Sequence, residues 1–249
     1  MGSVEQTMKN FLYSLFIGLF GIAALTSIAF LLMYAAQSKQ QAHLYSDLAA
    51  VRKQDTQQET ASEPEKQASY QNLYWENTDM VGWILIEDTN IDYPVMQTPT
   101  DPTYYLKHDF EKNYTDYGCP FMQADCDALA PSDNLILYGH NMKDGTMFGR
   151  LTQYEKSIDY LKAHPFVDFS TLWHQERYVI FAVVDVSLDT SSGNFLDYFA
   201  HPRFSSDAEF ASYIRRAELA SMYAIPMDVK PSDALLTLST CLEENRLVV

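Results

Sequence analysis

A long apolar stretch opens the chain and a polar stretch follows it. No position between Lys9 and Lys39 is charged. Residues 11–36, the apolar part of this stretch, would span about 39 Å as a helix, which is more than the hydrocarbon core of a bilayer requires. Because a secretory signal has a shorter apolar region, we predict a retained membrane anchor over residues 10–38, behind a short tail of residues 1–9.

Residues 39–68 form a polar segment between the predicted anchor and the rest of the chain. Leu44, Leu48 and Val51 keep the spacing of one face of a helix, so we expect this stem to begin with a short helix and to continue as a flexible linker. Residues 72–79 are expected to form the last part of a second helix, which ends near Gly82.

Short apolar runs with strand character dominate residues 69–249, which we predict to be one folded domain. The strands are expected over residues 83–86, 91–96, 119–123, 134–138, 177–186, 234–240 and 246–249. An amphipathic helix is expected over residues 207–223, because Phe210, Tyr213 and Ile214 recur on one side of it. Many short strands with irregular connections and few helices predict a mainly β fold, a closed β-barrel with added helices.

Acidic residues outnumber basic ones, and the excess lies in the predicted folded domain. The formal net charge is −16, and residues 69–249 hold 27 of the 33 acidic and 12 of the 17 basic residues. Polyanion binding needs clustered Lys and Arg side chains, so this composition excludes a role in binding nucleic acid.

The cysteine and histidine contents limit the kinds of site that the chain can form. Cys119, Cys126 and Cys241 are too few for the framework of a disulfide-rich secreted domain. For Cys119 and Cys126 we favour free or buried thiols over the local disulfide that their spacing also permits. The six histidines lack the spacing of metal ligands, so we expect neither a metal nor another cofactor.

Two predicted strands end in residues that suit covalent catalysis. The strand over residues 134–138 breaks at Gly139 and presents His140, and the strand over residues 234–240 ends at Cys241. Taken alone, a histidine of this kind is usually a surface residue and such a cysteine is usually a small core residue. If the fold brings the two strand ends together, however, they form a pair of nucleophile and base.

The residues after Cys241 strengthen this hypothesis. Across a tight hairpin Cys241 would lie directly opposite Arg246, with Cβ atoms about 4.5–5.5 Å apart. Glu243 and Glu244 are poor residues for a two-residue turn, so we favour a four-residue loop over residues 242–245. Either geometry places a guanidinium beside the thiol, where it favours the thiolate and donates hydrogen bonds to an oxyanion.

Together these segments resemble the signature of the sortase family. The run Thr-Leu-Ser-Thr-Cys over residues 237–241, followed by Arg246 and preceded by Tyr-Gly-His over residues 138–140, carries the resemblance, which extends over residues 73–249. The helical approach to the first strand and the helix ahead of the cysteine strand resemble class B sortases. This resemblance implies an eight-stranded barrel held outside a Gram-positive cell, an orientation that the few charges flanking the anchor leave undecided.

The resemblance also implies an activity, that of a cysteine transpeptidase. Cys241 would attack the carbonyl of a Thr residue in the C-terminal sorting signal of a surface protein and form a thioacyl-enzyme. His140 would act as general acid and then as general base, and Arg246 would hold the oxyanion. An amine of a peptidoglycan precursor would then release the product. The backbone N–H of Leu242 would help Arg246 to hold the oxyanion, and Tyr138 and Ser239 are candidates for shaping the substrate groove.

Three alternatives remain open at this point. A sortase that polymerises pilins would use the same residues with a pilin amine as acceptor. Another extracellular Cys–His peptidoglycan enzyme, such as an L,D-transpeptidase or a wall hydrolase, would place its cysteine before or close to its histidine, unlike His140 and Cys241. A tethered binding module without catalysis would show no thiol reactivity that a substrate protects.

Overall fold

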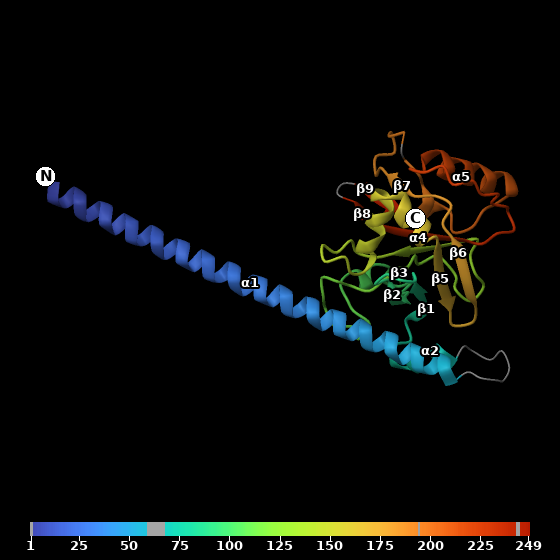
Figure 1. The fold of residues 1–249 in the computed structure, drawn as a ribbon, viewed down its shortest axis with the longest axis horizontal. Helices are drawn as coiled ribbons and strands as arrows, with labels where there is room; N and C mark the ends of the chain where they lie inside the picture. Colours follow the sequence, from blue (N-terminus) through green and yellow to red (C-terminus); the bar gives the residue numbers. More distant parts are fainter. Residues whose placement is uncertain (1, 59–67, 194, 243–244) are drawn as a thin grey trace. The chain divides into compact units, whose positions relative to one another are not determined.

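The computed structural model describes residues 2–58, 68–193, 195–242 and 245–249, which form two compact units (Figure 1). The first unit extends to Leu44, and the second unit is Tyr45–Val249. Helix α1 (Gly2–Gln58) begins in the first unit and ends in the second.

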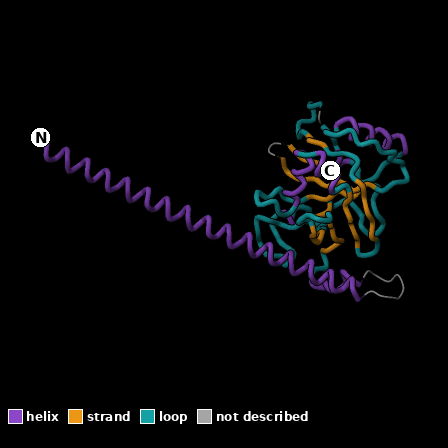
Figure 2. The backbone as a smooth tube through the Cα atoms, in the orientation of Figure 1, coloured by secondary structure: helices purple, strands orange, loops and turns teal. Residues whose placement is uncertain are grey.

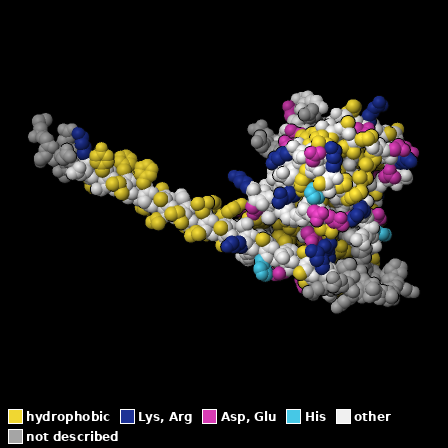
Figure 3. All heavy atoms as spheres, viewed as in Figure 1, with side chains coloured by type: hydrophobic (Ala, Val, Ile, Leu, Met, Phe, Trp, Pro, Cys, Tyr) yellow, Lys and Arg dark blue, Asp and Glu magenta, His cyan; other side chains and the backbone are white. Residues whose placement is uncertain are grey.

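The first unit is helical and apolar on its surface. Large side chains from Phe11 to Tyr34 are exposed all along this part of α1, where apolar atoms cover the helix in Figure 3. The helix is long enough and apolar enough to cross a membrane, by length and composition. These features are compatible with the anchor predicted over residues 10–38.

The end of α1 belongs to the second unit, which differs from the expected stem. Tyr45, Leu48 and Ala49 are buried, and the Tyr45 hydroxyl donates a hydrogen bond of 2.7 Å to the Gly118 carbonyl. The folded unit therefore begins before the predicted boundary at residue 69, because the apolar positions of the stem are buried against the sheet. The flexible part of the predicted linker falls largely on residues 59–67, which lie outside the described residues.

An arginine near the end of α1 adds polar contacts to this packing. The Arg52 guanidinium lies 5.2 Å from the centre of the Trp83 ring and pairs with the Asp92 carboxylate at 3.2 Å. The Trp83 indole N–H donates to the same carboxylate at 2.7 Å. These contacts attach the helix to the first two strands of the second unit.

The second unit is built on one sheet, with short helices between its strands. The strands are β1 (Met80–Leu85), β2 (Asp92–Met96), β3 (Phe121–Met122), β4 (Asn134–Tyr138), β5 (Phe166–Thr171), β6 (Gln175–Val179), β7 (Val184–Val186), β8 (Leu235–Leu242) and β9 (Asn245–Val248). The α-helices are α2 (Ala68–Glu76), α3 (Thr152–Lys156), α4 (Ile158–Ala163) and α5 (Asp207–Ala220), and the 3-10 helices are η1 (Tyr104–Leu106), η2 (Phe148–Leu151) and η3 (Tyr198–Ala200). Figure 2 shows the strands gathered inside the unit with loops around them.

The predicted fold class is confirmed, with differences in detail. The unit is mainly β, with helices before the sheet and α5 ahead of the cysteine strand. The sheet has nine strands in the order β6-β5-β1-β2-β3-β4-β8-β9-β7, rather than eight in a closed barrel. No pairing joins β6 to β7 within the described ranges, so the sheet is curled and open.

One predicted strand is divided and one strand was missed. The run expected over residues 177–186 forms β6 and β7, which lie at opposite ends of the sheet order, and β5 (Phe166–Thr171) was not expected. An apolar run indicates burial, but it does not identify the strand with which the backbone pairs. The division of this run therefore depends on contacts distant in sequence.

The pairing of β4 with β8 brings the two candidate chemical segments together. The two strands are parallel and in register from Asn134 opposite Leu235 to Tyr138 opposite Ser239. Both strands are mostly buried, as expected for a parallel pair inside a sheet. Because parallel strands end at the same edge, the residues that follow Tyr138 and Ser239 are neighbours.

Candidate active site

A cavity of about 690 Å³ lies at this edge of the sheet. Five of the six predicted site residues line it: Tyr138, His140, Ser239, Cys241 and Arg246. In the part of the chain that the structure describes, no group of three or more His, Cys, Asp or Glu side chains is arranged to hold a metal ion.

Strand register places the arginine next to the thiol. Leu238 and Val249 exchange both backbone hydrogen bonds, and hydrogen-bonded pairs alternate with non-hydrogen-bonded pairs along an antiparallel ladder. Cys241 and Arg246 are the third pair after this one, so they face each other at a non-hydrogen-bonded position. Side chains approach most closely at such positions. Arg246 Nη1 accordingly donates a hydrogen bond of 3.0 Å to Cys241 Sγ. The guanidinium thus holds a fixed positive charge beside the exposed sulfur.

The same register makes the connection between β8 and β9 shorter than expected. Leu242 pairs with Asn245, so the expected four-residue loop is wrong and the ladder leaves only residues 243–244, which are outside the described residues. Because hydrogen-bonded and non-hydrogen-bonded pairs alternate along the ladder, Leu242 and Asn245 form a hydrogen-bonded pair. The Leu242 N–H is therefore directed toward Asn245, away from the oxyanion role expected for it.

His140 is oriented by a backbone carbonyl from another part of the chain. Its Nε2 lies 2.7 Å from the carbonyl oxygen of Leu106, in η1. Because a carbonyl oxygen only accepts, Nε2 carries the proton of this hydrogen bond, and Nδ1 is the nitrogen left to exchange protons in the cavity.

The glycine before His140 allows an aromatic ring to pack closely against the strand end. A Cβ atom at Gly139 would lie 2.6 Å from the Phe148 ring. The Phe148 N–H also donates to the His140 carbonyl at 2.9 Å. The break in the strand at Gly139 therefore lets η2 support the backbone of the histidine.

Two hydrogen bonds that the sequence analysis missed fix the strand ends to each other. The side-chain amide of Asn141 donates to the Cys241 carbonyl at 2.8 Å, and the Thr240 hydroxyl donates to the Gly139 carbonyl at 2.8 Å. Thr240 lies within the run over residues 237–241 and Asn141 directly follows His140, which is the only signal the sequence offered for them. Their bonds hold the backbone of the nucleophile against the backbone of the base.

Tyr138 and Ser239 line the cavity, and their hydroxyl groups bond to other residues of its wall. The Tyr138 hydroxyl donates to the side-chain oxygen of Gln123 at 2.5 Å, and the hydroxyls of Ser239 and Tyr198 are 2.8 Å apart. Burial raises the pKa of Tyr138 and that of Tyr198 above the usual value, so both phenols stay protonated. Both predicted residues thus contribute to the cavity by holding its walls.

The three cysteines differ sharply in accessibility. Cys119 and Cys126 are free and buried, as the sequence analysis favoured, whereas Cys241 is free and exposed. Burial raises the pKa of the Cys126 thiol to about 11, and it also raises the pKa of the Cys119 thiol. Cys241 is therefore the one cysteine of the three whose sulfur is accessible to a substrate.

Comparison with known proteins points to one family. A family model described as the sortase domain matches residues 84–249. A curated relative from Listeria monocytogenes, named Sortase B, is 34% identical over 178 residues, which are 70% of this chain and 69% of the relative. A Staphylococcus aureus sortase B–substrate complex shares the fold, with a TM-score of 0.75 at 24% identity over 86% of this chain and 95% of that chain. A sortase B complexed with triglycine has a TM-score of 0.75 at 25% identity, and the match covers 85% of this chain and 96% of that chain.

Proposed function

The chain belongs to the sortase family, whose sortase B members are cysteine transpeptidases, and we propose that it cleaves a C-terminal sorting signal after a Thr residue. The observation that supports this most directly is the hydrogen bond of 3.0 Å from Arg246 to the exposed sulfur of Cys241, at one cavity with His140. A nucleophile, a proton carrier and a cation in one cavity suit acyl transfer.

In the first half of the proposed reaction, Cys241 transfers its thiol proton to Nδ1 of His140 and its sulfur attacks the Thr carbonyl carbon. The carbonyl electron pair moves to oxygen, where the Arg246 guanidinium stabilises the negative charge. His140 then gives the proton to the leaving amine as the C–N bond breaks. The product is a thioester between Cys241 and the shortened protein.

In the second half, an amine acceptor replaces the protein's lost C-terminal segment. His140 takes a proton from the amine as the amine nitrogen attacks the thioester carbon. The sulfur of Cys241 leaves as a thiolate and takes the proton back from His140, which restores the starting thiol. The new bond is an amide. We propose an amine of a peptidoglycan precursor as acceptor, supported by the similar sortase B that is complexed with triglycine. A pilin amine is the alternative acceptor.

We also propose where the chain works. Residues 10–38 would form a single membrane span after the short tail of residues 1–9, and the catalytic unit would lie outside the cell. The long apolar helix α1 supports this layout, as does the cell-surface location of sortases. Because the folded unit begins at Tyr45, only a short piece of chain would separate it from the span.

The test uses the full chain in detergent and a pool of peptides with one fixed Thr and randomised neighbours. We expect cleavage after Thr and a thioester mass on Cys241 when the acceptor triglycine is withheld. Cys241→Ala should abolish both, whereas Cys126→Ala serves as the matched cysteine control and should retain them. Cleavage by the Cys241→Ala variant, or binding of peptides by the unmodified chain without cleavage, would refute the proposal.

A further inference from the structure

One wall of the cavity is the single-turn helix η3 (Tyr198–Ala200). The Phe199 side chain lines the cavity and is 46% exposed, while Tyr198 is buried and bonded to Ser239. The backbone bonds of the turn itself are Ala200 to Asp197 and His201 to Tyr198, at 2.9 and 3.2 Å. So short a turn does not fix its own position, and side chains from elsewhere must hold it.

Gln123 is the first of these side chains. Its Nε2 donates hydrogen bonds to the Phe199 carbonyl at 2.8 Å and to Asp125 Oδ1 at 2.7 Å, and its Oε1 accepts from the Tyr138 hydroxyl. Both neighbours of Nε2 only accept, which fixes the orientation of the amide. Because both N–H groups are used, Gln123 links three parts of the cavity wall.

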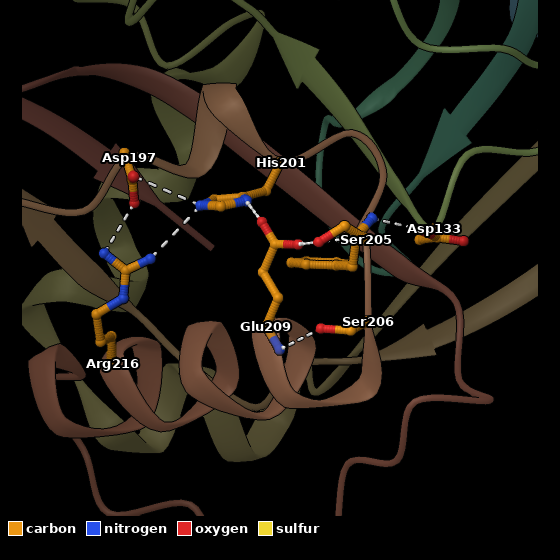
Figure 4. Close-up of polar contacts among 8 residues, drawn as sticks. Asp133, Asp197, His201, Ser205, Ser206, Glu209 and Arg216 are labelled. Atoms are coloured by element: carbon orange, nitrogen blue, oxygen red, sulfur yellow. Dashed lines mark hydrogen bonds and ion pairs between the residues drawn. The ribbon is translucent and has the colours of Figure 1, made fainter.

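A cluster of charged side chains holds both ends of the same turn (Figure 4). Arg216, on α5, pairs with Asp197 at 3.0 Å, and Asp197 immediately precedes η3. His201, immediately after η3, lies 3.4 Å from Asp197 and 3.5 Å from Glu209 of α5. The second terminal nitrogen of Arg216 lies 3.5 Å from the His201 ring. The turn is thus tied to α5 before and after Phe199.

Helix α5 is a firm support for these contacts. Ser206 caps its first turn by accepting from the Glu209 N–H, and the Glu209 carboxylate in turn accepts from the hydroxyl and N–H of Ser205. Phe210, Tyr213 and other apolar residues of α5 are buried. An ion pair to this helix therefore fixes η3 relative to the core.

We propose that Gln123 and Arg216 are positioning residues that hold η3 against the substrate peptide, an inference that rests on the proposed transpeptidase function. Neither side chain contacts the sulfur of Cys241. Gln123 bonds to the backbone of Phe199, the residue of η3 that faces the cavity, and Arg216 holds Asp197 and His201 on either side of η3. Losing either contact should weaken peptide binding and leave the chemical step at Cys241 unchanged, since a small displacement of a binding group is costly.

The test measures KM and kcat of the full chain with the best-cleaved peptide of the pool. Gln123→Met keeps the length of the side chain without its hydrogen bonds, and Arg216→Gln removes the ion pair at the surface. Each should raise KM by about fivefold or more, with kcat and the rate of Cys241 alkylation by iodoacetamide within about twofold of the unmodified chain. Arg215→Gln, a neighbouring change on α5, is the matched control and should alter neither constant.

A double-variant cycle identifies the route of the effect. Phe199→Ala should itself raise KM. Adding Gln123→Met to it should raise KM by less than about twofold more, because both changes act through the contact between the Phe199 side chain and the peptide. Additive effects would overturn this route.

The remaining outcomes are also decisive. An unchanged KM with a lowered melting temperature in both single variants would show that the contacts serve stability alone, and a loss confined to kcat would equally overturn the inference. If Gln123→Met does not fold, the surface change Arg216→Gln carries the same test. Absence of cleavage by the unmodified chain would overturn the proposed function, whereas cleavage with unchanged KM in the variants would overturn this inference alone.

Discussion

Replacing Arg246 by Lys tests whether the oriented guanidinium matters beyond its charge. The arginine donates from Nη1 to Cys241 Sγ at 3.0 Å, from the neighbouring strand of a two-strand ladder. Lysine keeps the positive charge but loses the planar group with its fixed donors. Because the strand register is a backbone property, Arg246→Lys should leave the ladder and the position of Cys241 in place.

The expected loss can be worked from the distance. Two unit charges 3.0 Å apart attract by about 5.5 kcal/mol at an effective dielectric constant of about 20. If the shorter lysine withdraws the charge by about 1.5 Å, the attraction falls to about 3.7 kcal/mol, a loss of about 2 kcal/mol in stabilising the negative sulfur or oxygen. That loss alone slows the reaction about 30-fold, and removing one oriented oxyanion donor brings the expected decrease in kcat to about 100-fold or more.

The assay is single-turnover formation of the thioester, followed by mass spectrometry on the full chain with saturating peptide. Single-turnover conditions isolate acylation from product release. Arg203→Lys is the matched control, because the Arg203 guanidinium donates to the Ala130 carbonyl and does not line the cavity. It should react at the unmodified rate. An Arg246→Lys variant within about threefold of the unmodified rate would refute this account of the guanidinium.

Three further outcomes follow from the structure. At pH 8 iodoacetamide should label exposed Cys241 and leave Cys126 unlabelled, since burial raises the pKa of Cys126 to about 11; peptide mapping that finds native Cys126 modified would contradict this. Tyr45→Phe should lower the free energy of unfolding by about 1 kcal/mol in urea titrations, because the hydroxyl donates to the buried Gly118 carbonyl; an unchanged midpoint would count against it. A hydrogen bond from the Lys107 ammonium lowers the pKa of Asp116. The charged carboxylate therefore stabilises the fold at pH values above its ordinary pKa, and this stabilisation is lost as the pH falls through the lowered pKa. The small gap in melting temperature between the unmodified chain and Asp116→Asn should therefore close between pH 6 and pH 3, and a gap that widens on acidification would contradict the sign.

The parts of the site that sequence reasoning reached are those determined by neighbours along the chain. The opposition of Cys241 and Arg246 follows from the length of one connection, since strand register carries a position across a hairpin. The apolar run ending in His140 likewise identified β4. Local spacing was sufficient for both because few backbone arrangements satisfy it.

The parts that sequence reasoning missed depend on segments far apart in the chain. The hydrogen bond from Gln123 to Phe199 joins residues 76 positions apart, and the bond from Tyr45 to Gly118 joins residues 73 apart. The residues next to Gln123 and Tyr45 in the sequence give no indication of which distant residue each of them will contact. The start of the folded unit at Tyr45 was misplaced for the same reason, because a polar-looking helix reveals its buried face only when the opposing surface is known.

This division between local and distant contacts has a consequence for how the site works. The reacting groups lie on strand ends whose relative positions are set by backbone hydrogen bonds and by the bonds of Asn141 and Thr240. The binding wall at η3 is set instead by side chains, which single substitutions can change without disturbing the sheet. Substitutions in the wall can therefore alter which peptide binds while the chemistry at Cys241 continues.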